Sequence, residues 1–446
     1  MTKARPAGSA GEFASLTIVG LLLALAFGAA ALPWIMPDKD ATARWFAAIC
    51  IFVASYLALA IGKVPGLSID RAGVALVGAC LMVASGVVSL DEAYRAVDLG
   101  TITLLLGMMI VVANLRISGF FALVNAWVAR RVHRPLLLLA AIVVVSGAFS
   151  AFLVNDAICL VMAPLVLELT LGLGRNPVPY LLAVAMASNV GSTATITGNP
   201  QNMMIGSFSH IPYTQFAGSL APVAVIGLVL TIALLAVMHR AALRGATMQP
   251  RVPRVRVNFV LVARSLAATA LVVALFFAGQ PPAKAAIVVG ALLLLTRRVK
   301  SARVYAEIDW SLLLMFAGLF IIVAGAERQL LSPQAIEAVG RLHLDAIPML
   351  SAVTAVLSNM VSNVPAVLLL KPFVAALPDH DRAWLVIAMA STLAGNFTVL
   401  GSIANLIVVE KAARRGIVIS FWDYFRVGAP LTLLTLAAGT MWLMWT

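Results

Sequence analysis

The chain has 446 residues, of which 62% are hydrophobic and 11% are charged, and its mean hydropathy is +1.03. A soluble fold cannot bury that much apolar surface, so the composition indicates an integral membrane protein. The net charge of +13 does not indicate a nucleic-acid partner, because the basic residues are distributed between apolar segments and are not gathered in one domain. The three cysteines form neither a disulfide framework nor a CxxC metal pattern.

The chain begins with basic residues that precede an apolar run over about 15–36, which is long enough to span a membrane. A signal peptide is the alternative, and the length favours a retained first helix. Further spans are predicted near 43–62, 72–90 and 98–115. A short segment from Ser118 to Arg134 follows and ends in the basic sequence ARRVHR.

The next apolar stretch, 135–173, is interrupted by Asn155 and Asp156, and we interpret it as a re-entrant hairpin. A segment over 178–208 contains SNVGSTATITGNPQN, whose glycines, proline and polar residues predict a broken helix. Exposed backbone at membrane depth is tolerated only where it lines a cavity or packs against protein. A span near 219–239 completes this half of the chain.

A basic, proline-containing connection at 241–256 is the one plausible linker, and the second half then follows the same plan. Its predicted elements are spans near 259–277, 284–296 and 308–327, a short segment to about 344, a hairpin at 347–378, a broken helix at 384–411 and a span at 427–445. The predicted fold class is therefore an all-α polytopic membrane protein with about eleven spans and two hairpins.

The two predicted hairpins have matching sequences. SAFLVNDAICLVMAP, from Ser150 to Pro164, aligns with SNMVSNVPAVLLLKP, from Ser358 to Pro372, with Ser, Asn and Pro at the same offset of 208. The broken helices match as well, because AMAS recurs at an offset of 203, which also pairs Thr195, Gly198 and Asn202 with Thr398, Gly401 and Asn405. Earlier in each half, Asp98 lies nine residues before Gly107, as Asp309 does before Gly318. These pairs indicate an internal repeat.

Each repeat holds five spans and one hairpin, an odd number of crossings, so the two repeats must lie in opposite orientation. This is the inverted-repeat plan of secondary transporters. We divide the chain into an N-terminal segment with an extra helix (1–40), repeat one (41–240), the basic cytoplasmic linker (241–256) and repeat two (257–446).

The distribution of charge predicts the orientation. With the N-terminus in the cytoplasm, most of the 31 Lys and Arg fall on the cytoplasmic side, which is the positive-inside bias. We therefore expect a multi-pass protein of a bacterial-type cytoplasmic membrane, with its C-terminus outside. The first hairpin then enters from the inside and the second from the outside.

Two hairpins and two broken helices bring four interrupted backbones to the midplane of the membrane. Half-helix N-termini supply free N–H groups and partial positive charge there, and unwound carbonyls supply oxygen ligands for a cation. We predict a polar substrate and ion pocket with one fixed acid, lined by Asn155, Asp156, Asn189, Ser192, Thr193, Thr195, Ser362, Asn363, Asn396 and Thr398.

Asp156 admits a second interpretation, in which it or Asn155 only caps the second leg of the hairpin. A carboxylate at the bilayer centre costs roughly 2.5–3.5 kcal/mol, and a neutral residue could cap instead, so ion or proton binding is favoured. The Ser, Thr and Asn runs have the alternative role of helix packing. Lys371 is expected to extend toward the outer surface. The five histidines lack ligand spacing, so neither a metal site nor a cofactor is predicted.

The hairpin and broken-helix sequences, together with GSIANLIVVEKAARRG and ISFWDYFRVGAPLTLL, resemble the ion transporter superfamily, specifically its arsenite permease and sodium/proton antiporter branch. The resemblance covers nearly the whole chain after the first helix. It implies alternating access coupled to protons or sodium, through an elevator-like movement of the hairpin-bearing part. A homodimer is a family-level expectation, and a soluble ATPase partner stays open.

The related sodium-coupled dicarboxylate symporters carry Ser-Asn-Thr at both hairpin tips, whereas this chain has VND at 154–156 and SNV at 362–364. An ionised Asp156 would repel a carboxylate, and Val364 cannot donate a hydrogen bond to one, so sodium-coupled symport of a (di)carboxylate or other anion ranks third. Proton-coupled export of arsenite or antimonite is the leading hypothesis, and sodium/proton antiport is close behind. Neither GxSxG nor HExxH occurs, so an intramembrane enzyme is not expected.

Overall fold

The computed structural model describes residues 10–36, 40–61, 69–132, 134–244, 257–295, 298–330 and 343–446. Within these ranges every regular element is a helix. Eight of the described helices are long and apolar enough to cross a membrane, by length and composition. The predicted class, an all-α polytopic membrane protein, is confirmed. The chain divides into two compact units, one made of Met1–Ile102 with Asp309–Leu342 and the other of Thr103–Ile308 with His343–Thr446.

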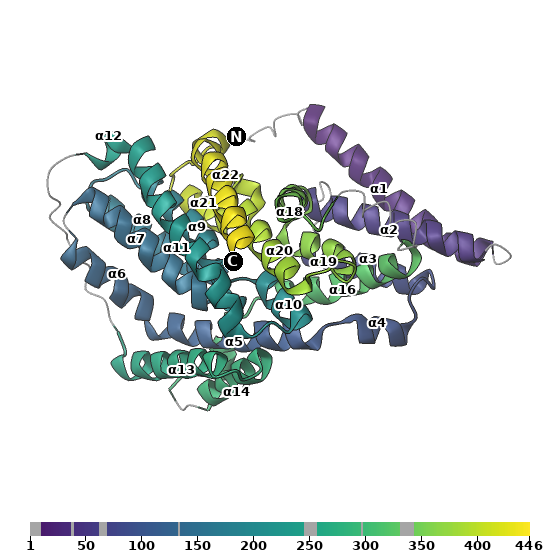
Figure 1. Ribbon diagram of the computed structural model, residues 1–446, viewed down its shortest axis with the longest axis horizontal. Helices are drawn as coiled ribbons and strands as arrows, with labels where there is room; N and C mark the ends of the chain where they lie inside the picture. Colours follow the sequence, from purple (N-terminus) through teal and green to yellow (C-terminus); the bar gives the residue numbers. More distant parts are fainter. Residues whose placement is uncertain are drawn as a thin grey trace, which may run out of the picture. The chain divides into compact units, whose positions relative to one another are not determined.

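The first unit combines the beginning of the chain with one helix from far along it. Its elements are α1 (Ala10–Ile35), α2 (Asp40–Ile61), α3 (Arg71–Ala84), α4 (Leu90–Ala96) and α16 (Trp310–Leu330). Helix α16 packs against α2 and α3 (Figure 1). The contact with α3 is close because Gly318 has no side chain: a Cβ placed there would lie 2.6 Å from the backbone carbon and oxygen of Ala75.

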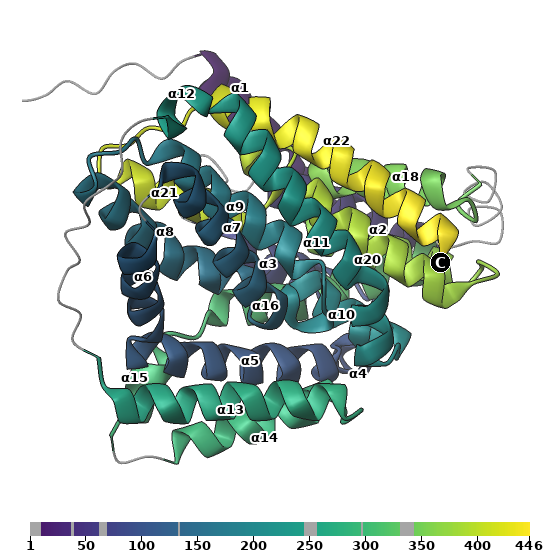
Figure 2. The same cartoon turned by 60° about the vertical axis from the view of Figure 1, so that its left-hand side comes forward.

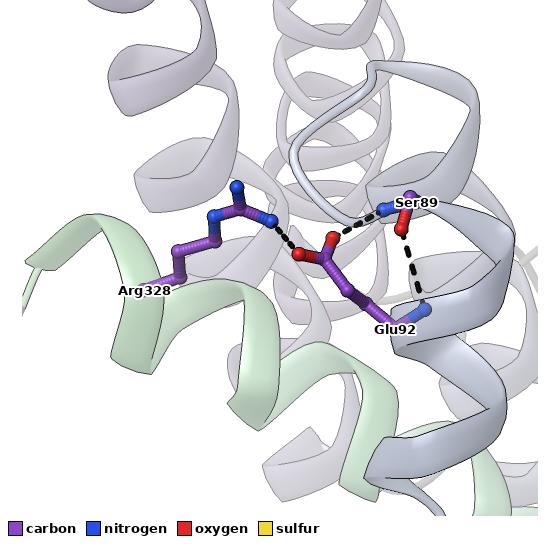
Figure 3. Close-up of polar contacts among 3 residues, drawn as sticks. All are labelled: Ser89, Glu92 and Arg328. Carbon is purple, nitrogen blue, oxygen red and sulfur yellow. Dashed lines mark hydrogen bonds and ion pairs between the residues drawn. The ribbon is translucent and has the colours of Figure 1, made fainter.

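A capping box begins α4 in the first unit (Figure 3). The Ser89 hydroxyl accepts a hydrogen bond from the Glu92 N–H at 3.3 Å, and the Ser89 N–H donates to the Glu92 carboxylate at 2.8 Å. The same carboxylate pairs with Arg328 in the last turn of α16. The hydrogen bonds from Ser89, followed by Arg328, hold the pKa of Glu92 below its ordinary value. The pair joins α4 to α16, although its exposure makes its contribution to stability small.

The second unit holds the other helices. Two matching sets of elements carry the predicted hairpins and broken helices: α7 (Pro135–Phe152), α8 (Asn155–Gly172), α9 (Val178–Ser192), α10 (Pro200–Ser209) and α11 (Tyr213–Met238), and then α18 (Ile347–Val361), α19 (Asn363–Val374), α20 (His380–Ala394), α21 (Ile403–Ala413) and α22 (Phe421–Trp445). Helix α7 packs against α9 as α18 packs against α20, and α11 packs against α22.

The remaining elements of the second unit include a layer of three helices (Figure 2). Helix α5 (Leu99–Ser118), which begins in the first unit and continues in the second, runs beside α13 (Phe259–Phe277) and α14 (Pro282–Leu294). A Cβ at Gly107 of α5 would lie 2.5 Å from the backbone of Ala286 in α14. Gly107 precedes Gly318 by 211 residues, and Ala75 precedes Ala286 by the same offset, so the two contacts are equivalent with the roles of the two halves exchanged. In both units, therefore, a glycine of one half meets an alanine of the other.

The helix interruptions lie where the polar residues predict them. The first hairpin sequence breaks between Phe152 and Asn155, and the second breaks at Ser362. Both broken helices contain an unwound stretch with one 3-10 turn, at Ile196–Gly198 and Val399–Gly401. That the hairpins are re-entrant, and that the chain makes eleven crossings in two inverted repeats, stay predictions.

Some expectations differ from the structure in length or lie outside it. The predicted spans at 72–90 and 284–296 correspond to helices of 14 and 13 residues. The short helices α4, α6 (Phe120–Arg131), α12 (Arg240–Leu243) and α15 (Ser301–Tyr305) complete the described elements, and α4, α12 and α15 are too short for a periodic sequence signal. Most of the predicted linker at 241–256, and the segment 331–342, lie outside the described residues.

The close contact at Gly318 gives a test of the first unit. Gly318→Ala should destabilise the protein by about 1–3 kcal/mol, because the added methyl group must displace the α3 backbone. The measurement is the midpoint of thermal unfolding of the purified protein in detergent. Gly218→Ala in α11 is the matched control, because a Cβ there meets nothing within 4 Å. Equal midpoints for the two variants would contradict the close packing.

Candidate functional site

Asn189 of α9 is the centre of a buried hydrogen-bond network in the second unit. Its Nδ2 donates to the side-chain oxygens of Asn396 and Asn405, both at 2.9 Å. Its Oδ1 accepts from Asn155 Nδ2 and from Ser402 Oγ, both at 3.1 Å. The side chain is 1% exposed. A primary amide has two hydrogens to donate and two lone pairs to accept with, so Asn189 uses its whole capacity on protein partners.

The partners of Asn189 come from different elements. Asn155 is the first residue of α8, at the first hairpin tip, and Asn396 follows the end of α20. Ser402 and Asn405 lie at the start of α21, after the second unwound stretch. A helix of the first half therefore bonds to the polar side chains around the helix break of the second half.

Thr392 of α20 makes the reciprocal contact with the first broken helix. It lies 203 residues after Asn189, the offset that relates the two broken helices. Its hydroxyl accepts from Asn199 Nδ2 at 3.1 Å and from Gln201 Nε2 at 3.2 Å, and donates to Asn202 Oδ1 at 3.4 Å. The network is thus crossed: each half supplies the polar side chain that meets the break in the other.

Asn202 clamps the first unwound stretch. Its Nδ2 donates to the backbone oxygens of Ser192 at 3.1 Å and Thr195 at 3.0 Å, which are carbonyls freed where α9 ends. Gly198 lies against the Ser192 carbonyl, where a Cβ would collide with the backbone. Buried carbonyls need partners, and the asparagine supplies them inside the chain itself.

The second broken helix has the same clamp at the offset of 203. Asn405 Nδ2 donates to the backbone oxygens of Gly395 at 2.7 Å and Thr398 at 3.1 Å. A Cβ at Gly401 would lie 2.8 Å from the Gly395 oxygen. In each broken helix, therefore, the repeated Asn donates hydrogen bonds to the free backbone carbonyls, and the repeated Gly allows the close backbone approach.

The hairpin tips differ from the rest of the network because they retain unused oxygens. Asn155 Oδ1 and Asn363 Oδ1 are buried and have no hydrogen-bond partner. Asp156 is half-buried in the first turn of α8, one residue after Asn155. Ser362 turns the second tip with φ of 77°, a backbone conformation that side chains rarely adopt. Unsatisfied buried oxygens cost about 1–3 kcal/mol each, so the tips are the places suited to a bound ion or water.

The structure brings some of the ten predicted pocket residues together and separates others. Asn155, Asn189 and Asn396 share the central network. Ser192 and Thr193 donate to the backbone oxygen of Asn189. Thr195 donates to the Ala151 carbonyl of α7, and Thr398 contributes its backbone oxygen. No hydrogen bond among the described residues joins Ser362 or Asn363 to the network.

Several residues of the network were not predicted from the sequence, namely Asn199, Gln201, Thr392, Ser402, Asn405, Asn202 and Tyr424. Asn202 and Asn405 had a signal, because both appear in the alignment of the two broken helices. Tyr424 had none: it begins the last long helix, and its hydroxyl reaches Asn396 Oδ1 at 3.5 Å.

An all-helical membrane protein with paired hairpins and broken helices around one polar network has the architecture of a secondary transporter. The sequence model of the citrate transporter family, CitMHS, matches residues 56–394. The chain belongs to this family, which lies within the ion transporter superfamily. The predicted superfamily is confirmed.

Named relatives cover most of the chain. The uncharacterized transporter MT2759 of Mycobacterium tuberculosis is 32% identical over 89% of this chain and 97% of its own length. The silicon efflux transporter LSI3 of Oryza sativa is 29% identical over 84% of this chain and 93% of its own. The putative transporter arsB of Dictyostelium discoideum is 24% identical over 84% and 87%.

Among solved structures, the YdaH transporter of Alcanivorax borkumensis is similar to this chain with a TM-score of 0.59. The match covers 90% of this chain and 98% of that one at 15% sequence identity, so it shows the fold alone. Fold and relatives together identify the chain as a multi-pass membrane transporter.

The central role of Asn189 can be measured. Asn189→Ala would leave four buried groups without their partner, each costing about 1–3 kcal/mol, so the midpoint of thermal unfolding should fall substantially. Asn125→Ala is the control, because the half-buried Asn125 donates a single hydrogen bond, to the Leu165 carbonyl. A fall no larger than that of the control would show that the crossed network does not stabilise the fold.

Proposed function

We propose that the chain exports a small neutral hydroxylated acid of a metalloid, arsenous or antimonous acid, in exchange for protons bound at the first hairpin tip. The observation that carries this proposal is the chemistry of the first hairpin tip and its surroundings, which are neutral amides and hydroxyls with an unpartnered Asn155 Oδ1 and one adjacent carboxylate, Asp156. An undissociated oxyacid presents hydroxyl groups that donate and accept hydrogen bonds, which are the groups that Asn, Ser and Thr recognise.

The charge of the substrate distinguishes a neutral metalloid acid from citrate, the substrate for which the family is named. Citrate carries several negative charges at neutral pH and needs cationic partners when it is desolvated. The side-chain hydrogen bonds described above for Asn189, Thr392, Asn202 and Asn405 involve no Lys or Arg. The names of two relatives, a silicon efflux transporter and a putative arsB transporter, support a hydroxylated metalloid substrate.

The coupling step is assigned to Asp156 with Asn155. A proton on the carboxylate neutralises a charge that is costly within the membrane, and its release resets the site. Asn155 tethers the tip to Asn189 through Nδ2 and keeps Oδ1 unused, next in sequence to the acid. Protons moving inward would therefore drive the substrate outward by alternating access.

Sodium/proton antiport is the second candidate, and a specific observation favours it. The unpartnered Oδ1 atoms of Asn155 and Asn363 are neutral oxygen ligands of the kind that hard cations prefer. Sodium would then be the coupling ion or the cargo. Sodium-coupled symport of a carboxylate, the class of substrate for which the family is named, ranks third because Asp156 repels an anion at close range.

Replacing Asp156 distinguishes a role in proton coupling from a role in capping helix α8. Asp156→Asn should abolish coupled transport and leave the folded protein in the membrane, because an amide caps a helix as well as a carboxylate but binds no proton. Asp381→Asn, at the exposed start of α20, is the control and should transport normally. Full activity of Asp156→Asn would reduce Asp156 to a helix cap.

Transport in inverted membrane vesicles distinguishes the two leading substrates. Under an imposed proton gradient, we expect arsenite to accumulate inside the vesicles, at a rate that depends on the gradient. Sodium-driven proton movement is measured in the same preparation. Sodium-driven exchange without arsenite movement would overturn the leading proposal in favour of the antiporter.

A further inference from the structure

Three pairs of buried side-chain oxygens in the second unit have no hydrogen-bond partner, and one offset relates the members of every pair. At 208 residues apart they are Ser146 with Thr354, Ser150 with Ser358, and Asn155 with Asn363. All six side chains are at most 9% exposed. Because the same offset relates the two hairpins, the unpaired oxygens recur at equivalent places on the first leg and tip of each hairpin.

Buried hydroxyls of α8, α11 and α22 behave differently. Thr170, Thr231 and Thr435 each donate to the carbonyl four residues earlier, at 2.7 to 2.8 Å. This is the usual arrangement of a Ser or Thr within an apolar helix. Four hydroxyls of α7 and α18 have no such partner and are available to a ligand, and each would cost about 1–3 kcal/mol if it stayed unsatisfied: Ser146, Ser150, Thr354 and Ser358.

The two sets differ in how far they extend. On α18, Ser351 precedes Thr354 and Ser358 with spacings of three and four residues, so the three hydroxyls share one helix face over about 10 Å. Ser351 is buried, and its hydroxyl bonds to Thr440 of α22 at 3.0 Å. The equivalent of Ser351 on α7 is Val143, which is fully buried and apolar. The polar track on α18 therefore begins one turn from the start of its helix, whereas the track on α7 begins deeper.

A small pocket lies at the beginning of the α18 track. It is formed where α18 and α20 begin, and Leu350, one turn before Thr354, is part of its wall. Its volume of about 40 Å³ has room for about two or three water molecules. Asp345, Asp379 and Arg382 line it, and the Arg382 guanidinium lies 3.6 Å from the Asp379 carboxylate, so one negative charge is in excess.

We infer that the hydroxyls of Ser351, Thr354 and Ser358 form a hydrated access path for a monovalent cation, from the pocket at Asp345 and Asp379 to the second hairpin tip at Asn363. Water bound along the track satisfies the unpaired hydroxyls and carries a proton, or a partly hydrated sodium ion, through an apolar region. The excess carboxylate at the pocket attracts cations and disfavours anions.

The path goes beyond the proposed function because it assigns the entry route to the tip that lacks an acid. The inference rests on the proposed function only for the identity of the ion that uses the path. Hydration of the track is a separate property, and it can be measured without any transported substrate.

Cysteine accessibility tests the hydration directly. Ser351→Cys, Thr354→Cys and Ser358→Cys are each treated with a small, membrane-impermeant cationic thiosulfonate in right-side-out and inverted vesicles, and labelling of each peptide is followed by mass spectrometry. A thiol reacts as its thiolate, which forms only where water reaches it, so we expect labelling from one side at least about tenfold faster than in the controls.

The controls are matched in residue type and in helix. Thr170→Cys replaces a buried hydroxyl that has a backbone partner, and Val356→Cys occupies the exposed apolar face of α18, where Val356 is 58% exposed. Rates at all three track positions no faster than at Thr170→Cys would overturn the access path. Conservative cysteine substitutions at three positions keep the test decisive if one variant fails to fold.

Transport kinetics give a second test. Thr354→Val removes the hydroxyl and keeps the shape, so the maximal exchange rate should fall about tenfold or more if the path carries the ion, and Asp345→Asn should raise the cation concentration at half-maximal rate. Unchanged kinetics in both variants would overturn ion conduction along the track. If wild-type vesicles transport neither arsenite nor sodium, the proposed function fails, and the labelling result still decides whether the track is hydrated.

Discussion

The structure depends on satisfying the backbone at two helix breaks inside an apolar protein. An interrupted helix frees carbonyl and N–H groups that lipid cannot satisfy, so side chains or other backbone must do so. Asn202 and Asn405 perform this role in equivalent positions, each donating to two carbonyls of its own unwound stretch. Gly198 and Gly401 let the chain approach closely enough for those bonds to form. The breaks are thus stable elements with fixed geometry, as a binding site built on irregular backbone requires.

The crossed network couples the two halves of the second unit. Asn189 of α9 holds the region after α20, and Thr392 of α20 holds the region after α9. Because Asn189 also binds Asn155, a displacement of the first hairpin tip must break a bond to the same amide that holds the second break. A buried amide with all its bonds made has no spare capacity for a substrate, so ligands must either replace one of these partners or bind at the tips.

Much of the fold followed from local sequence signals. The polar pair at Asn155 within an apolar run predicted the first interruption, and its repeat at Asn363 predicted the second. The pairing within the network could not be predicted in the same way, because Asn189 meets Asn396 and Asn405 more than 200 residues away, and no local pattern specifies which amide faces which. For the same reason the sequence did not predict that α16 of the second half packs against α3 of the first, or that α14 of the second half packs against α5 of the first. Helix periodicity identifies an apolar face and does not identify the helix that packs against it.

The two hairpin tips now differ in more than one residue. Both keep an unused asparagine oxygen and two unpaired hydroxyls on the first leg, so the arrangement of these oxygens recurs at the offset of 208. Only the first tip has an acid, Asp156, and its first leg is apolar before Ser146. Only the second has hydroxyls that reach the beginning of its helix and an acidic pocket there. A charge that must titrate needs shelter from bulk water, and an ion that must enter needs hydration along its route. The proposed function and the proposed access path both use this difference, because they assign the coupling charge to the first tip and the entry of the ion to the second.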